Sequence, residues 1–281
     1  LSDIAEVRTG PFGSQLHNED YVSTGTPIVT VEHLGNRRFS KQNLPLVSDD
    51  DKKRLSKYLL QEGDIVFSRV GSVDRCSYVT SAENDWLFSG RCLRVRCGNN
   101  CHPLFLYYYF CKESVKQYIK SIAVGATMPS INTKLMAEIP ILLPKLEEQR
   151  CIADILSSFD DKIELNRRIN DNLEQQAQAL FKSWFVDNSN PNWEETSLSE
   201  VASFVGGYSY TGEELTDCSN IAMATIKNFG RNGGFKADGF KEINPSAKLK
   251  ECHYANLFDI LVAHTDLTQN ADVIGLSLIH I

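Results

Sequence analysis

With 281 residues, of which 42% are hydrophobic and 23% charged, the chain has the composition of a folded protein and is long enough for two domains. No apolar run approaches the roughly twenty residues of a membrane helix, and the first ten residues lack the basic-then-apolar pattern of a secretion signal. We therefore expect a cytoplasmic protein that does not enter a membrane.

The charge is unevenly distributed along the chain. The net charge is −7, but residues 1–145 carry 18 basic and 15 acidic residues, 146–190 carry 5 and 9, and 191–281 carry 6 and 12. Local basic stretches lie at 36–41, 51–57 and 89–98. A negative total does not exclude nucleic-acid binding, because phosphate contacts depend on local patches.

Short strand-like runs alternate with turns in the first 145 residues. Residues 102–122 instead predict a helix that opens at Pro103 and has no internal Gly or Pro. Its aromatic residues 107–110 could stack on bases, although such residues more often belong to a core. The sequence thus predicts a mixed α/β domain over 1–145. Runs rich in Val, Ile, Leu and Phe predict its strands at 26–34, 63–70, 86–97 and 138–144.

A long helix is predicted next, over residues 146–187. From Ile152 a strict 4,3 spacing marks ten positions, eight of them apolar, as in a coiled-coil seam. Asn166 and Asn170 lie in mid-seam, where polar residues fix register. A single helix of roughly 60 Å cannot bury its own row of apolar side chains, so we expect it to pack against a partner helix. The alternative is an ordinary long helix in the core of a domain. The apolar seam residues are Ile152, Leu156, Phe159, Ile163, Leu173, Ala177, Leu180 and Trp184.

After residue 193 the sequence starts again. Three short segments of the first half recur in similar form in the second half, and we call each such pair an echo. The second and third echoes are separated by 195 residues and the first by 197 residues. We therefore infer a tandem duplication of a unit that consists of an α/β domain and a long helix. The echoes are LSDIAEV (1–7) and LSEVASF (198–204), TVEHLG (30–35) and TIKNFG (225–230), and GDIVFSR (63–69) and FDILVAH (258–264).

The second copy, over 188–275, is expected to be incomplete, because the sequence ends before its helix. Residues 276–281 have no evident counterpart in the first copy and are interpreted as a truncation or frame artefact. The first residue, Leu1, is not Met, which suggests a fragment or a processed product.

The sequence contains only partial matches to the motifs of catalytic and metal-binding sites. A phosphate-binding loop needs a Lys after its glycines, but Gly207–Gly212 is followed by two glutamates. Residues 190–193 have one of the two prolines of an adenine methyltransferase cluster, and 159–164 match a metal-dependent nuclease only in spacing. Cys97, Cys101 and His102 lack a second pair at zinc-site spacing, so neither a catalytic nor a metal site is predicted.

Three stretches resemble the DNA-specificity (S) subunit of type I restriction-modification systems. They lie at 1–14, 62–72 and 125–169. In the last stretch, Pro144, Glu148, Gln149, Ile152 and Ala153 match the family's Pro, Glu-Gln and Ile-Ala positions. The resemblance extends to Gly275, and it favours an S subunit that is truncated within its second target-recognition domain.

The resemblance implies a protein without catalysis of its own. Each α/β (α+β) target-recognition domain would read one half of a split double-stranded DNA sequence, and the long coiled-coil-type helix would set the spacing. The helix would also dock methyltransferase subunits, which restriction-translocase subunits can join. S-adenosylmethionine, ATP and Mg²⁺ are expected in those partners and no cofactor in this chain. A second copy of the chain could pair through the helix.

DNA contacts are expected from side chains that reach base edges or phosphates. Arg69 and Arg75 are the preferred candidates, because they border a Gly-containing loop just past a strand end. The second copy has His264 at the position of Arg69, which predicts a different half-site or different contacts. The full set of DNA-binding candidates is Ser14, Gln15, Arg37, Arg38, Lys41, Arg69, Arg75 and Lys134.

Two other functions stay open from the sequence. One is a stand-alone restriction endonuclease or methyltransferase, and the other is a protein whose helix serves oligomerisation only. Each DNA-binding candidate could also be ordinary solvated surface.

Overall fold

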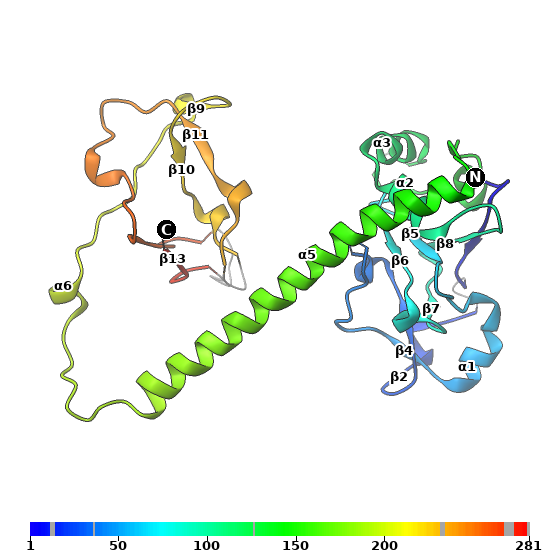
Figure 1. Ribbon diagram of the computed structural model, residues 1–281, viewed down its shortest axis with the longest axis horizontal. Helices are drawn as coiled ribbons and strands as arrows, with labels where there is room; N and C mark the ends of the chain where they lie inside the picture. Colours follow the sequence, from blue (N-terminus) through cyan, green and yellow to red (C-terminus); the bar gives the residue numbers. More distant parts are fainter. Residues whose placement is uncertain (12–14, 36, 126, 231–233, 267–272, 280–281) are drawn as a thin grey trace. The chain divides into compact units, whose positions relative to one another are not determined.

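The computed structural model describes residues 1–281 except 12–14, 36, 126, 231–233, 267–272 and 280–281. The chain divides into two units, Leu1–Val186 and Asp187–Ile281 (Figure 1). The strands of the first unit are β1 (Ala5–Thr9), β2 (Tyr21–Val22), β3 (Thr26–Val29), β4 (Leu46–Val47), β5 (Ile65–Ser68), β6 (Cys76–Tyr78), β7 (Leu87–Phe88) and β8 (Cys92–Cys97). Its helices are α1 (Asp49–Arg54), α2 (Pro103–Cys111), α3 (Glu113–Ile122), α4 (Thr133–Ala137) and α5 (Leu146–Phe181), with 3-10 turns η1 (Asn18–Asp20), η2 (Val31–His33), η3 (Ser56–Tyr58) and η4 (Ser81–Glu83).

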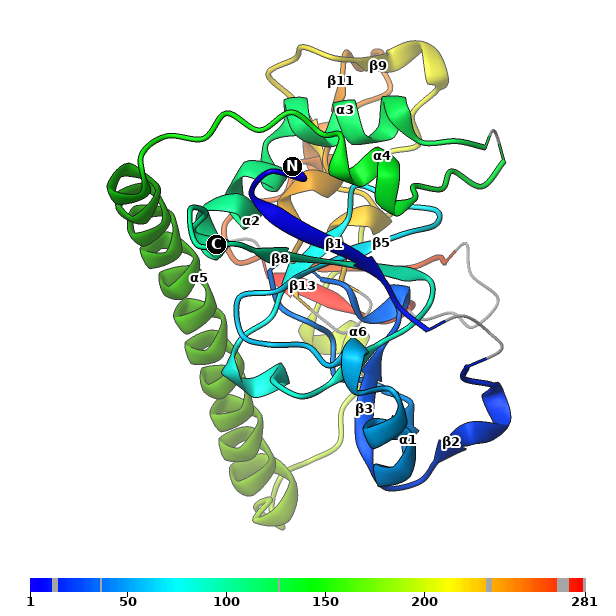
Figure 2. The same cartoon turned by 90° about the vertical axis from the view of Figure 1, so that its right-hand side faces the viewer.

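Strand β5 lies between the two hydrophobic clusters of the first unit. It belongs to an antiparallel sheet in the order β1-β8-β5-β6, and α2 and α3 cover one face of that sheet (Figure 2). Ile65 and Phe67 point into the cluster under these helices, whereas Val66 points into the other cluster. This alternation is the period-two pattern of a strand that is buried on both faces.

The second cluster is built on a second sheet, in the order β2-β4-β3-β7. Here β3 pairs in parallel with β7, with Ile28 opposite Leu87 and Val29 opposite Phe88. All four side chains are fully buried. The α/β fold expected from the sequence is confirmed, as two small sheets with helices on one side.

Four predicted elements differ in the structure. The strand expected over 26–34 ends at Val29 and is followed by η2, and the strand expected over 86–97 is divided into β7 and β8, which belong to different sheets. The helix expected over 102–122 breaks at Lys112, whose extended backbone ends α2 and begins α3. The segment 138–144, expected to be a strand, has no regular secondary structure and pairs with no strand that the structure describes. Its proline nitrogens have no hydrogen to donate, and the carbonyl of Ile139 accepts instead from the amino group of Leu1 at 2.7 Å.

Helix α5 leaves the domain beside α2 and continues past it (Figure 1). A π-helical segment, Lys182–Asp187, extends it. The face that packs on the domain includes Gln149, 1% exposed, and Ala153, fully buried. Every described side chain over 165–181 is exposed. Across the described residues, no helix is long and apolar enough to cross a membrane.

The second unit repeats the first at the level of single hydrogen bonds. Thr225 N donates to the side chain of Asn228, as Thr30 N donates to the side chain of His33. Three further strands, in the order β10-β11-β9, correspond to β3-β4-β2. The elements are α6 (Leu198–Val201), β9 (Leu215–Thr216), β10 (Ala222–Met223), β11 (Lys241–Ile243), β12 (Ile260–Val262) and β13 (Ser277–Ile279), with 3-10 turns η6 (Gly212–Glu214), η7 (Ile226–Asn228), η8 (Ala237–Gly239) and η9 (Glu251–His253).

The third echo is repeated in the same way. Asn256 N donates to Asp259 Oδ2 at 2.7 Å, as Gln61 N donates to Asp64 Oδ2 at 2.8 Å. Strand β12 then takes the place of β5. The first echo is only partly repeated, because the described residues after α6 form no counterpart of β1. At an offset of 195, the counterpart of β8, which pairs with β1, would fall after residue 281.

The last residues have a place in this repeat that the sequence comparison missed. Strand β13 pairs with β12, with Ile260 opposite Ile279, as β6 pairs with β5, with Ile65 opposite Tyr78. Part of 276–281, expected to lack a counterpart, therefore occupies the position of β6. The connection before it is longer in the second unit, which removes the constant offset by which the other echoes are recognised.

Candidate nucleic-acid interface

Residues 69–75 connect β5 to β6 as a loop held by a neighbouring segment. Gly71 N donates to Pro129 O at 2.8 Å, and Ile131 N donates to Arg69 O at 3.0 Å. Gly71 has a φ of +74°, a left-handed conformation that glycine adopts without steric cost. The loop is therefore held at a fixed position at the end of β5.

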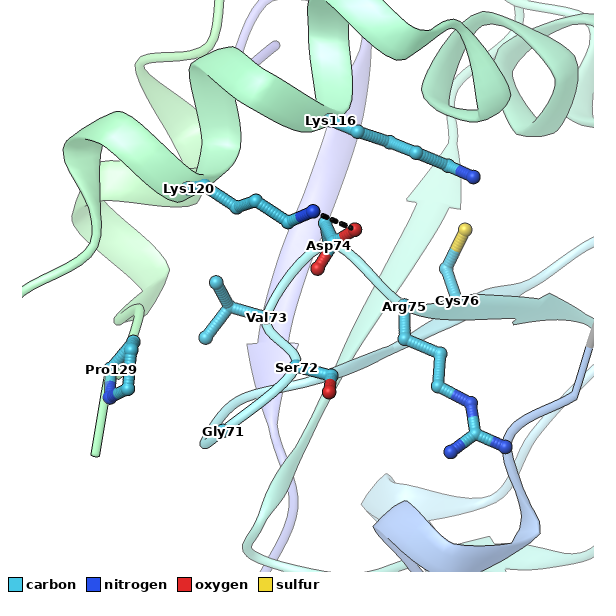
Figure 3. Close-up of a pocket in the computed structure, with 9 residues that line it drawn as sticks. All are labelled: Gly71, Ser72, Val73, Asp74, Arg75, Cys76, Lys116, Lys120 and Pro129. Carbon is cyan, nitrogen blue, oxygen red and sulfur yellow. Dashed lines mark ion pairs between the residues drawn. The ribbon is translucent and has the colours of Figure 1, made fainter. Parts of the chain in front are cut away.

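The loop forms one wall of a basic pocket of about 630 Å³, and α3 forms the opposite wall. Lys116 and Lys120 reach from α3 toward the loop, whereas Arg75 turns to the other side (Figure 3). Lys120 Nζ lies 3.1 Å from Asp74 Oδ2. The lining residues are Gly71, Ser72, Val73, Asp74, Arg75, Cys76, Lys116, Lys120 and Pro129.

The pocket has more positive than negative charge. Lys116 and Lys120 contribute two cations and Asp74 contributes one carboxylate, while the guanidinium of Arg75 points away from the two lysines. Among the ion pairs of the described residues, none includes Lys116. Such a concave, cationic and solvent-open site attracts phosphate groups. The two lysines were not predicted from the sequence, although their spacing of four residues on a helix puts them on one face.

The guanidinium of Arg69 lies on the strand side of the loop. Its Nη1 donates a hydrogen bond to Gly90 O at 3.3 Å. The backbone carbonyl of Arg69 accepts a hydrogen bond from the amide of Ile131, two residues before the start of α4. Lys134 is exposed on α4. The structure therefore brings the segments of Arg69, Arg75 and Lys134 together around the 129–131 segment.

The structure describes two of the next three candidates, Gln15 and Lys41. Ser14 falls outside the described residues. Gln15 Oε1 accepts from Tyr58 OH at 2.8 Å, so this side chain helps to fix the turn after α1. Lys41 Nζ lies 3.8 Å from Glu83 and 5.9 Å from the ring centre of Trp86. These contacts of Gln15 and Lys41 do not involve the 69–75 loop.

Arg37 and Arg38 lie side by side in the chain but differ in environment. Arg38 is exposed. The Arg37 side chain is 14% exposed, and its Nη1 lies 2.9 Å from Asp161 Oδ1 and 3.6 Å from Asp160 Oδ2, both on α5. The guanidinium of Arg37 is thus engaged with the long helix, whereas that of Arg38 faces solvent.

The basic stretch at 89–98 is largely internal. Arg94 is 1% exposed and donates to Glu6 Oε2 at 2.9 Å. Arg96 donates to both carboxylate oxygens of Asp64, at 2.6 Å each, and this hydrogen bonding raises the pKa of Arg96. These two arginines stabilise the sheet, so the local charge of the sequence overstates the basic surface here.

The cysteines form two close pairs near α2. Cys97 and Cys101 have their sulfurs 3.3 Å apart. A hydrogen bond from Cys76 lowers the pKa of Cys111 to about 7. Within the described residues, no group of three or more His, Cys, Asp or Glu side chains could hold a metal ion.

The predicted seam of α5 is exposed along its whole length. Ile152 and Leu156 also line an apolar hollow of about 520 Å³ with Phe105, Tyr109 and Leu142. The start of the seam adjoins the face of Gln149 and Ala153 that packs on the domain, whereas the seam residues further along α5 are open to a partner. Its exposed residues are Ile152, Leu156, Phe159, Ile163, Leu173, Ala177, Leu180 and Trp184.

Known proteins resemble this chain in sequence and in fold. The sequence model of the family described as "Type I restriction modification DNA specificity domain" matches residues 1–175. The specificity subunit of the type I restriction enzyme HindI from Haemophilus influenzae is 30% identical over 201 residues, which cover 70% of this chain and 42% of that protein. The MjaIX specificity subunit from Methanocaldococcus jannaschii is 29% identical over 192 residues, 66% of this chain and 43% of that protein.

This chain spans less than half the length of these two relatives. The crystal structure of the type I restriction-modification S subunit from M. genitalium aligns with a TM-score of 0.50 at 19% identity, and the alignment covers 79% of this chain and 57% of that one. At that identity the likeness concerns the fold. The family match over 1–175, which is more than half of the chain, establishes the relationship. The chain belongs to the type I restriction-modification DNA specificity family.

Proposed function

We propose that the first unit reads one half of a bipartite double-stranded DNA target as part of a type I restriction-modification complex. The observation that carries the proposal is the fixed 69–75 loop with the basic pocket beside it. A rigid loop at a strand end can present side chains to base edges, and adjacent cations can hold the phosphates.

The two sides of the loop have different roles in this proposal. Lys116 and Lys120 bind backbone phosphates and set the position of the duplex. Arg69, Arg75 and Lys134 reach toward the bases, where an arginine can bond the O6 and N7 of guanine. His264 of the second unit takes the sequence position of Arg69, so the second half-site differs.

The long helix spaces the two readers and docks the methyltransferase subunits, with restriction-translocase subunits joining the assembly. Methyl transfer and cleavage, with S-adenosylmethionine, ATP and Mg²⁺, belong to those partners. The exposed seam of α5 also allows a second copy of the chain to pair with it, because an apolar stripe on a rod is stabilised by another helix.

Selection of bound duplexes from a random pool with the full chain tests the proposal. Wild type is expected to enrich one sequence motif, and Arg69→Ala with Arg75→Ala is expected to lose that enrichment. Lys116→Ala with Lys120→Ala should weaken binding to all sequences and reduce the slope of log K against log salt by about two. Lys162→Ala, an exposed lysine on α5, is the control and should change neither.

The outcomes separate the alternatives. Enrichment of no motif by wild type, or unchanged enrichment in the double arginine variant, would contradict the assignment of the loop. Methylation of DNA by the purified chain with S-adenosylmethionine and no added subunit would contradict a scaffold without catalysis.

A further inference from the structure

Arg37 joins the recognition domain to α5. Its guanidinium is 2.9 Å from Asp161 and 3.6 Å from Asp160, and the Arg37 side chain is largely buried, whereas Asp161 is 61% exposed. The pairing is thus made by an arginine held in the domain and carboxylates on the helix. A guanidinium is suited to this task, because its fork of donors can bind two carboxylates at once.

A second side chain of the domain reaches the same carboxylate. Tyr108 OH, on α2, donates to Asp160 Oδ2 at 2.8 Å. Burial and this hydrogen bond raise the pKa of Tyr108, so the phenol keeps its proton. Asp160 therefore accepts from Tyr108 while it faces Arg37, and both contacts disfavour movement of the helix away from the domain.

The backbone of Arg37 is tied to the strand that follows the reading loop. Tyr78 N donates to Arg37 O at 2.8 Å, and Gly35 N donates to Ser77 Oγ at 2.9 Å. Arg37 has a φ of +66°, an uncommon conformation for a residue with a side chain. Because β6 begins directly after Arg75, Arg37 lies between the loop and the helix.

The helix has another attachment near its start. Gln149 Oε1 accepts from His102 N at 2.7 Å, and its Nε2 donates to Pro144 O at 2.8 Å. Asp160 lies eleven residues further along, or about 16 Å at 1.5 Å per residue. A rod attached at one point can pivot, whereas a rod attached at two separated points has a fixed direction.

We infer that Arg37 is a positioning residue that fixes the angle between the recognition domain and α5, and does not contact DNA. The significance of this angle rests on the proposed function, since a spacer can set the distance between two readers only if each reader is rigidly oriented on it. The attachment itself is a property of the free chain.

The experiment measures the angle without DNA. Spin labels on unnatural amino acids at Lys53 and Lys162, both exposed, report the distance between the domain and α5 just past Asp161 in the full chain. Wild type and Arg38→Ala, the neighbouring control, are expected to give one narrow distribution. Arg37→Ala should broaden it at least twofold, and Asp160→Asn with Asp161→Asn should do the same.

Circular dichroism identifies any variant that fails to fold, and the carboxylate variants then test the attachment independently of Arg37. An unchanged distribution in a folded Arg37→Ala protein and in the carboxylate variant would overturn the inference. A second measurement uses a 30-base-pair random duplex. Arg37→Ala should keep the wild-type salt dependence of binding, whereas a slope reduced by about one would identify Arg37 as a phosphate contact. Failure of wild type to bind DNA would contradict the proposed function and leave the distance result intact.

Discussion

Asn228 caps the 3-10 turn of the second unit as His33 caps that of the first. Asn228 Oδ1 accepts from Thr225 N at 2.7 Å, and His33 Nδ1 accepts from Thr30 N at 3.1 Å. An imidazole and a carboxamide are chemically different, yet each offers one acceptor and one donor. His33 Nε2 bonds to Gln42 O, and Asn228 Nδ2 donates to Lys236 O. The two units therefore preserve these hydrogen bonds more closely than the identity of the residues that make them.

This equivalence predicts the effect of removing the second cap. Asn228→Ala should lower the free energy of local opening at residues 225–230 by about 1–2 kcal/mol, because the amide of Thr225 loses a buried acceptor. Asn228→His should retain most of the protection. Native-state hydrogen exchange of the Thr225 amide measures both, and equal exchange in wild type and Asn228→Ala would contradict the capping role.

The Arg96 to Asp64 pair predicts a larger effect in the first unit. The Asp64 side chain is 1% exposed and also accepts from Gln61 N at 2.8 Å. Asp64→Asn should destabilise the domain by about 2–4 kcal/mol, because it leaves a partly buried guanidinium without its counter-charge. Asp50→Asn, at a side chain 96% exposed, should change stability by less than about 0.5 kcal/mol. Urea denaturation followed by tryptophan fluorescence compares them, and similar midpoints would refute the prediction.

Glu6 predicts a pH-dependent contribution to stability. Burial favours its neutral form, but the charges of Arg94 and Arg8 outweigh this effect and hold the pKa of Glu6 below 4.5. The folded state therefore binds the proton more weakly than the unfolded state. The resulting stability is present above pH 4.5 and is lost as the pH falls through the folded pKa.

Glu6→Gln measures this contribution. Because Glu6 is 46% exposed, the wild-type advantage at pH 7 should be only about 0.5–1 kcal/mol. It should shrink as the pH falls below 4.5 and through the folded-state pKa of Glu6. Urea titrations of both proteins at pH 7 and pH 3.5 give the difference, and an advantage that grows on acidification would reverse the sign argued here.

The seam predicts assembly through α5. Phe159→Asp and Leu173→Asp should abolish self-association of the chain, because both side chains are exposed in the isolated chain and would need to be buried between helices. Folding of the domain should be unaffected. Gln175→Asp, an exposed residue outside the seam, is the control. Sedimentation velocity detects the change, and association retained by both seam variants would exclude this face.

The sequence predicted features that depend on periodicity and constant spacing. The long helix and the strands around Ile65 and Leu93 are confirmed by the structure, and the capping hydrogen bond of Thr30 recurs at Thr225, at the predicted offset of 195 residues. The break at Lys112 was missed, because no Gly or Pro marks it and tertiary packing decides it.

The environments of charged side chains could not be predicted in the same way. Composition does not distinguish Arg94, which pairs with Glu6 across strands, from Arg75, which is exposed. The pairing of Arg37 with Asp161 links residues more than 120 positions apart. Lys116 and Lys120 become part of the candidate site only because α3 folds back against the 69–75 loop. The roles of the DNA-contact candidates therefore stay predictions.

The solvent exposure of every described side chain over 165–181 has a thermodynamic consequence. A helical segment of this length without tertiary contacts is only marginally stable in water, because helix propensity alone scarcely offsets the loss of backbone entropy. Docking of a partner helix would then order this half of the rod as it binds. The measured affinity would be reduced by the ordering cost, and it would show the temperature dependence of a coupled folding reaction.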